Sequence, residues 1–158
     1  MSLGDGGGGN PQAQEIVQQI EELEQHQAAL EAEIEELQGQ KLDIDDAIEA
    51  VENLESGATV QVPLGGGAYV RAKVADIDEV IVDLGADYSA ERDQEGAVSS
   101  LESKQETLDD RIEELRSEIA EIETETDKLQ SRAEELQAQQ MQQLQQQQQR
   151  QQQRQQDE

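Results

Sequence analysis

Apolar residues along this chain follow two different periods. Over two long stretches they recur at alternating spacings of three and four, the period of a helix that packs along one side. When Ile16 is placed at heptad position d, the residues at a include Ile20, Ile34 and Ile48, and those at d include Leu23, Leu30 and Leu37. This arrangement favours two-stranded packing. The pattern predicts two long helices, over residues 11–56 and 92–140. Its main positions are Ile16, Ile20, Leu23, Leu30, Ile34, Leu37, Ile44, Ile48, Val51, Leu101, Leu108, Ile112, Leu115, Ile119, Ile122, Leu129 and Leu136.

Residues 57–91, between the two helices, show the alternation of apolar and polar side chains that is typical of β-strands. Turns at residues 65–67 and 85–87 separate the alternating runs, which predicts two successive β-hairpins. Such short strands cannot bury their apolar face within the insert, because an open sheet needs a covering layer. We therefore expect this face to pair with copies from other chains. Its side chains are Val60, Val62, Leu64, Val70, Val74, Val80, Val82 and Leu84.

Each predicted helix is on the order of 60 Å long at 1.5 Å per residue and needs a partner along its length. The other helix of the same chain is available, since the insert supplies a short reversal and the two lengths roughly match. The sequence thus predicts a mainly α protein, built on a long antiparallel two-helix coiled coil with both chain ends at the tip opposite the insert. In this arrangement Lys41 and Gln105 lie near one another. Gln27 and Lys41 are polar residues at heptad position a, which fix register at some cost in stability.

The two ends of the chain lack an apolar stripe. Residues 1–10 are rich in glycine and are predicted to be disordered. Residues 141–158 form a glutamine-rich tail interrupted by Arg150 and Arg154, in which Met141 and Leu144 are the last apolar residues. The pattern leaves open whether this tail extends the second helix or frays.

The net charge of the chain argues against partners that are themselves strongly negative. A net charge of −27, from 38 acidic and 11 basic residues, repels nucleic acid and anionic membrane surfaces. So large an acidic excess on an ordered pattern indicates a protein kept soluble in concentrated salt, where self-repulsion is screened. The alternative is an ordinary acidic coiled coil. The absence of cysteine, of a signal peptide and of an apolar span predicts a cytoplasmic location.

The sequence has few groups of residues that could form a catalytic, metal-binding or phosphate-binding site. His26 has no second histidine or cysteine with which to complete a zinc site. Asp43, Asp45 and Asp46 lack the glycine and the closing glutamate of a calcium loop, and residues 65–67 connect two strands rather than a strand and a helix, unlike a phosphate-binding loop. We expect no catalytic residue, no metal site and no cofactor, and hence no enzyme.

The order helix, two β-hairpins, helix resembles prefoldin, and the two hairpins indicate its α-type subunit. The resemblance spans about residues 12–140 and rests mainly on Val62-Pro63-Leu64-Gly65-Gly66-Gly67-Ala68-Tyr69-Val70 and Val80-Ile81-Val82-Asp83-Leu84-Gly85-Ala86. It implies a heterohexamer of two α-type and four β-type subunits, in which the hairpins close into an intersubunit β-barrel. The eight apolar side chains of the insert would then serve assembly.

The same resemblance implies an ATP-independent chaperone that binds non-native proteins at the coiled-coil tips and delivers them to a group II chaperonin. Fraying near a tip makes apolar side chains available to clients, and methionine suits varied surfaces. The tip residues would be Ile16, Val17, Ile20, Leu136, Met141 and Leu144. For Ile16, Ile20 and Leu136 an ordinary coiled-coil core position is an equally good interpretation.

Two other classes of protein remain open from the sequence. One is a non-chaperone coiled-coil scaffold in which the insert serves only oligomerisation; such a scaffold should not suppress client aggregation. The other is the helical arm of a nucleic-acid enzyme, against which the acidic charge argues.

Overall fold

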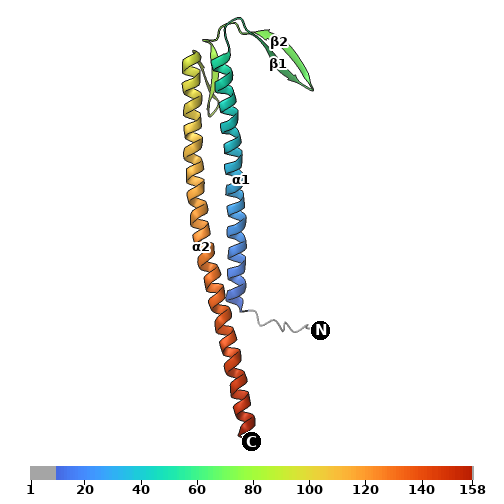
Figure 1. The fold of residues 1–158 in the computed structure, drawn as a ribbon, viewed down its shortest axis with the longest axis vertical. Coiled ribbons are helices and arrows are strands. Elements are labelled where there is room, and N and C mark those ends of the chain that lie inside the picture. Colours follow the sequence, from blue (N-terminus) through green and yellow to red (C-terminus); the bar gives the residue numbers. More distant parts are fainter. Residues whose placement is uncertain (1–9, 158) are drawn as a thin grey trace. The chain divides into compact units, whose positions relative to one another are not determined.

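The structure is a computed structural model that describes residues 10–157, in which two long helices flank two β-hairpins (Figure 1). Their order confirms the predicted sequence of helix, two hairpins and helix. Most of the range 1–10, predicted to be disordered, lies outside the described residues. The elements are α1 (Pro11–Asn53), β1 (Thr59–Gly65), β2 (Ala68–Lys73), β3 (Val80–Gly85), β4 (Tyr88–Arg92) and α2 (Gln94–Gln156).

Both helices begin with a side-chain cap. The Oδ1 atom of Asn10 accepts a hydrogen bond of 3.0 Å from the backbone N–H of Gln12, and that of Asp93 accepts one of 2.7 Å from the N–H of Gly96. Such caps satisfy backbone donors that have no partner in the first turn of a helix. They account for helix starts at Pro11 and Gln94, close to those predicted.

Contacts divide the chain into two compact units, and both helices contribute to each of them. One unit comprises residues 33–114, and the other comprises the segments before residue 33 and after residue 114. In the unit of residues 33–114, α1 and α2 pair in opposite directions: Glu33 contacts Arg111, Lys41 contacts Asp109 and Val51 contacts Gln94. This is the antiparallel pairing predicted from the short insert between two helices of similar length.

The unit formed by the two outer segments shows the same antiparallel pairing. Gln27 of α1 hydrogen-bonds Glu123 of α2 at 3.3 Å, and Gln12, Glu15 and Ile16 lie beside Leu129 and Arg132, further along α2. The buried side chains of this unit all occupy predicted heptad positions. They are Ile16, Leu30, Leu115 and Ile122.

The two hairpins are built on the same plan. β1 pairs with β2 and β3 with β4, both antiparallel, and each ladder has a register shift just before the turn, after Pro63 and after Asp83. Each turn has a two-residue loop with both residues at positive φ: Gly66 and Gly67 in the first, Ala86 (52°) and Asp87 (61°) in the second. Loops of this kind match the twist of the flanking strands.

The hairpins differ in how they meet the helices. Val82 of β3 is buried, and it forms a core with Ala97 and Leu101 of α2. The β1–β2 hairpin stands clear of both helices in Figure 1. The residues that pack against the Val82 core are Ile44, Ala47, Ile48, Val51 and Val80.

α2 is longer than α1 and includes most of the glutamine-rich tail. It continues as helix to Gln156. The sequence had left open whether this tail extends the helix or frays. In Figure 1 the last part of α2 extends past the start of α1. Among the described residues, no helix combines the length and apolar character needed to cross a membrane.

Candidate interaction surfaces

One face of the β1–β2 hairpin is apolar and largely uncovered. The ladder places Val62 directly opposite Val70, and Val60 opposite Ala72 on the same face. The side chains of Val62, Val70 and Leu64 are exposed. Cross-strand pairs of branched apolar residues normally stabilise a sheet by packing against a covering layer, and the described residues of this chain supply no such layer here.

The β3–β4 hairpin uses its two faces differently. Val82 is only 4% exposed because its own helices cover it, and Val80 packs in the same core. Ile81, between them, is 74% exposed, and Tyr88 at the start of β4 is 75% exposed. The face assigned to assembly from the sequence therefore contributes Val80 and Val82 to a core within the chain, while Leu84 near the turn remains exposed. Any assembly role of these three residues stays a prediction.

Ile81, Tyr69 and Tyr88 are also exposed, and none of the three was among the residues predicted for interaction. A signal for Ile81 was present. Val80, Ile81 and Val82 are consecutive apolar β-branched residues, and such runs are typical of strands covered on both faces. The inner face of β3 packs on α2, and Ile81 is an exposed apolar side chain on the outer face, which it shares with Asp83 and with Glu91 and Ser89 of β4.

The predicted tip residues fall into two groups. Ile16 is buried between the helices, and Ile20 and Leu136 are half-buried, as coiled-coil core positions would be. Val17, Met141 and Leu144 are 51%, 63% and 59% exposed. All six belong to the unit formed by the outer segments of the two helices.

Polar residues interrupt the helix pairing at the positions that the heptads indicated. The side-chain amide of Gln105 donates a 3.2 Å hydrogen bond to the backbone carbonyl of Lys41, and a further one to Asp45. This confirms that Lys41 and Gln105 are neighbours. The Lys41 ammonium in turn forms an ion pair with Asp109. Polar contacts of this kind disfavour other alignments of the two helices.

Arg111 also links the two helices. Its Nε and Nη2 atoms both donate to Glu33 Oε1, at 3.2 and 3.1 Å, and its Nη1 donates to Glu114 at 3.2 Å. Hydrogen bonds to Glu114, and next to Glu33, raise the pKa of Arg111 above its ordinary value. The pair is exposed and hence contributes little to stability by itself.

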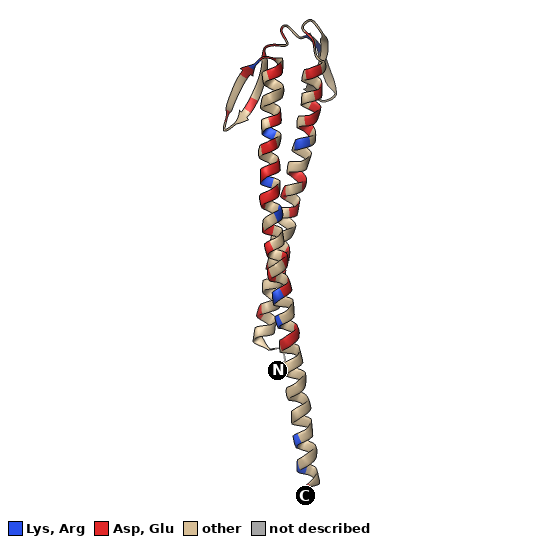
Figure 2. Cartoon of the chain, turned by 60° about the vertical axis from the view of Figure 1, so that its left-hand side comes forward, with Lys and Arg blue, Asp and Glu red and all other residues tan. Residues whose placement is uncertain are grey.

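Charge is distributed unevenly along the helices. Acidic residues are frequent along α1 and along α2 as far as Glu135, but none lies between Leu136 and Gln156. Figure 2 shows the contrast: red is frequent along both helices, whereas the last stretch of α2 is tan and blue without red. The basic residues of that stretch are Arg150 and Arg154.

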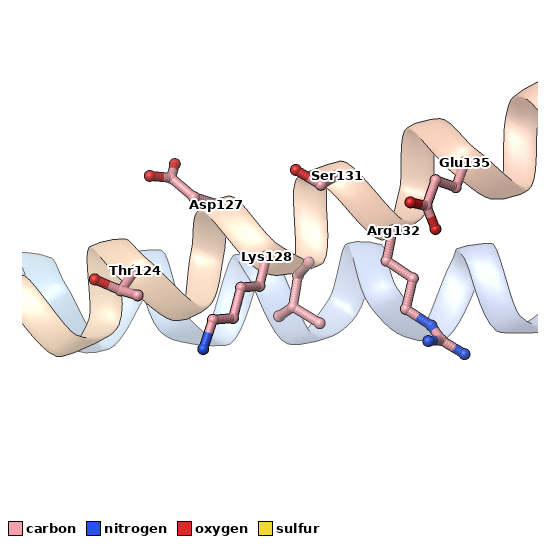
Figure 3. A pocket seen from close by; sticks show the side chains of 7 residues that line it. Thr124, Asp127, Lys128, Ser131, Arg132 and Glu135 are labelled. Atoms are coloured by element: carbon pink, nitrogen blue, oxygen red, sulfur yellow. The ribbon is translucent and has the colours of Figure 1, made fainter.

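The surface pockets along the helices are shallow, open grooves. The groove in Figure 3 is lined by residues of α2 alone, and most of them, including Asp127, Ser131 and Glu135, are exposed. Arg132 belongs to it and also lines a second groove with Gln12 and Glu15 of α1. Among residues 10–157, no three His, Cys, Asp or Glu side chains are grouped so that they could hold a metal ion. These surfaces suit contact with another polypeptide better than a small molecule.

Comparison with known proteins places this architecture in a family. The family described as prefoldin subunit matches residues 23–154. Prefoldin subunit alpha of Haloarcula marismortui is 59% identical over 97 residues, which cover 61% of this chain and 63% of that protein. Prefoldin subunit alpha of Halobacterium salinarum is 47% identical over 108 residues, 68% of this chain and 69% of the relative.

A solved structure supports the same assignment. The filamentous PFD of Methanocaldococcus jannaschii, determined by electron cryo-microscopy, is 30% identical and superposes with a TM-score of 0.51, over 77% of this chain and 98% of that one. The two relatives named above are α subunits from salt-loving archaea, as the acidic composition predicted. The family match, these relatives and the shared fold together show that the chain belongs to the prefoldin family.

Proposed function

We propose that this chain is the α-type subunit of a hetero-oligomeric chaperone that holds non-native proteins without ATP. The observation that carries the proposal is the placement of its exposed apolar side chains. Apart from Leu42 of α1, the large exposed apolar side chains of the described residues lie on the two hairpins and on the outer segments of the helices. The buried apolar side chains occupy the pairing face between α1 and α2 or the Val82 core. Large exposed apolar side chains in such groups mark interaction surfaces.

The hairpins supply the assembly surface in this proposal. Val62, Val70 and Leu64 of the first hairpin, with Ile81 of the second, are covered when hairpins of neighbouring subunits close into a β-barrel. Closure also removes the free strand edges that two-stranded sheets leave exposed. By likeness to the family we infer two subunits of this type with four β-type subunits.

The outer segments of the helices supply the client surface. Val17, Met141 and Leu144 offer exposed apolar side chains, and Met141 adapts to clients of different shape. Several weak surfaces of this kind around one complex bind a single client by multivalency. The complex then passes its client to a group II chaperonin, and no catalytic step is involved.

Suppression of client aggregation tests this function. The assembled complex, in molar KCl and without nucleotide, should keep a guanidinium-denatured enzyme from aggregating after dilution, as followed by light scattering. The triple variant Val17→Ser/Met141→Ser/Leu144→Ser should lose most of this effect. The matched control is Leu42→Ser, which removes a leucine of α1 that is 65% exposed but belongs to the unit of residues 33–114.

The result also separates the chaperone from a scaffold. A complex that assembles fully but leaves client aggregation unchanged would identify the chain as a coiled-coil scaffold. Delivery is a separate question, which co-sedimentation of the client-loaded complex with a purified group II chaperonin would answer.

A further inference from the structure

The end of α2 has the opposite charge from the rest of the chain. From Leu136 to Gln156 it contains no acidic residue, and its charged residues are Arg150 and Arg154. We call Met141–Gln156 the tail helix. It is about 24 Å long at 1.5 Å per residue, and every one of its side chains is exposed. The tail helix extends past the start of α1 (Figure 1).

The two arginines occupy a defined position on the tail helix. In the paired part of α2, the buried residues Ile112, Leu115 and Ile122 follow spacings of three and four. The same spacing, continued beyond Leu136, passes through Gln143, Gln147, Arg150 and Arg154. The positions by which α2 packs on α1 thus continue along the tail helix. There they carry amide and guanidinium groups in place of apolar side chains.

These side chains favour one kind of partner. Arg150 and Arg154 lie one helical turn apart, so both can engage neighbouring carboxylates. Glutamine amides can donate to and accept from the exposed backbone of an extended chain, and Met141 and Leu144 add apolar contact beside the stripe. We propose that the tail helix binds acidic segments of non-native polypeptides, with Arg150 and Arg154 as the residues that select them.

Arginine is better suited than lysine to bind carboxylates in concentrated salt. At molar ionic strength the Debye length is about 3 Å, so attraction over longer distances is largely screened. Selection must then depend on direct contact, and arginine forms paired, directional hydrogen bonds with carboxylates that lysine cannot.

This inference rests on the proposed function, and its test distinguishes the two. The full chain in its assembled complex is titrated in molar KCl into a labelled, unstructured polypeptide of Leu, Gly, Ser and Glu, and into a matched polypeptide with Gln in place of Glu. Fluorescence anisotropy reports binding. We expect the acidic polypeptide to bind roughly three- to tenfold more tightly.

Variants assign the preference to the tail helix. Arg150→Gln/Arg154→Gln should abolish it and leave binding of the neutral polypeptide unchanged, since glutamine keeps helix propensity and matches the neighbouring residues. Lys104→Gln/Arg116→Gln removes the same charge from the paired part of α2 and should keep the preference. Circular dichroism checks that helix content is equal in all proteins.

Three results would overturn the inference. Equal binding of both polypeptides by the unaltered complex would refute it while leaving the proposed function intact, and binding of neither would refute the proposed function as well. A change in complex mass by light scattering in Arg150→Gln/Arg154→Gln, without a change in polypeptide preference, would instead assign the tail helix to contacts with another copy of the chain.

Discussion

The side-chain amide of Gln94, the first residue of α2, donates a 2.6 Å hydrogen bond to the backbone carbonyl of Val51 in the last turn of α1. The same amide lies 3.2 Å from the carbonyl oxygen of Leu54. Carbonyls at the C-terminal end of a helix have no partner within the helix. Gln94 therefore caps α1 and holds the start of one helix against the end of the other, at the base of both hairpins.

Removal of this cap should lower stability without changing the fold. We expect Gln94→Ala to reduce the free energy of unfolding by about 1 kcal/mol, the usual contribution of a hydrogen bond plus part of the cost of unsatisfied carbonyls. Thermal unfolding followed by circular dichroism at fixed salt measures the change. Gln152→Ala in the exposed tail helix is the matched control, and equal stability of the two variants would contradict the capping role.

The second turn holds two non-glycine residues in the left-handed region, where the equivalent residues of the first turn are glycines. Ala86 has a φ of 52°, which costs an L-residue energy that glycine avoids. Ala86→Gly should raise the free energy of unfolding by about 0.5 kcal/mol, after allowance for the greater chain entropy of glycine. Ala75→Gly, outside the turns, serves as the control and should not raise it.

The two hairpins should respond differently to a charge on their apolar faces. Val62 is exposed in the single chain, so Val62→Asp should leave helix content and unfolding temperature nearly unchanged and block assembly. Val82 is buried against Ala97 and Leu101, so Val82→Asp places an unpaired charge in that core and should lower the unfolding temperature as well. Circular dichroism with size exclusion separates the two effects; equal loss of stability in both variants would be inconsistent with the structure.

Salt should stabilise the fold. With a net charge of −27, like charges along the paired helices repel one another until they are screened. From about 0.1 M to about 1 M KCl, over which the Debye length falls from about 10 to about 3 Å, the unfolding temperature should rise by roughly 5 °C or more. Asp43→Asn/Asp46→Asn should weaken this dependence, and equal stability at both concentrations would argue against it.

The sequence predicted the parts of this fold that follow from periodicity. Heptad spacing predicts both helices, and turn residues predict the hairpins. The short insert between two helices of similar length predicts their antiparallel alignment, which brings Lys41 beside Gln105. Alternation in a strand shows which side chains share a face but not what covers that face. For this reason the packing of Val82 on α2 could not be predicted.

Other features depend on contacts between residues far apart in the chain. The carbonyl group that accepts the hydrogen bond from Gln94 lies in the last turn of the other helix. No local sequence motif predicts this contact. The tail helix lacks an apolar stripe, so periodicity could not distinguish helix from fraying, although glutamine is a good helix former. In the candidate interaction surfaces, the apolar positions were identifiable from the sequence, but their exposure required the structure.

The mass of the complex tests the central claim most directly. Light scattering after size exclusion in molar KCl would compare the chain alone, the chain mixed with a β-type prefoldin subunit from a salt-loving archaeon, and the same mixture with Val62→Asp. We predict a hexamer in the second sample only. A monomer or simple dimer in all three samples would contradict the account, since the exposed hairpin faces would then have no partner subunit.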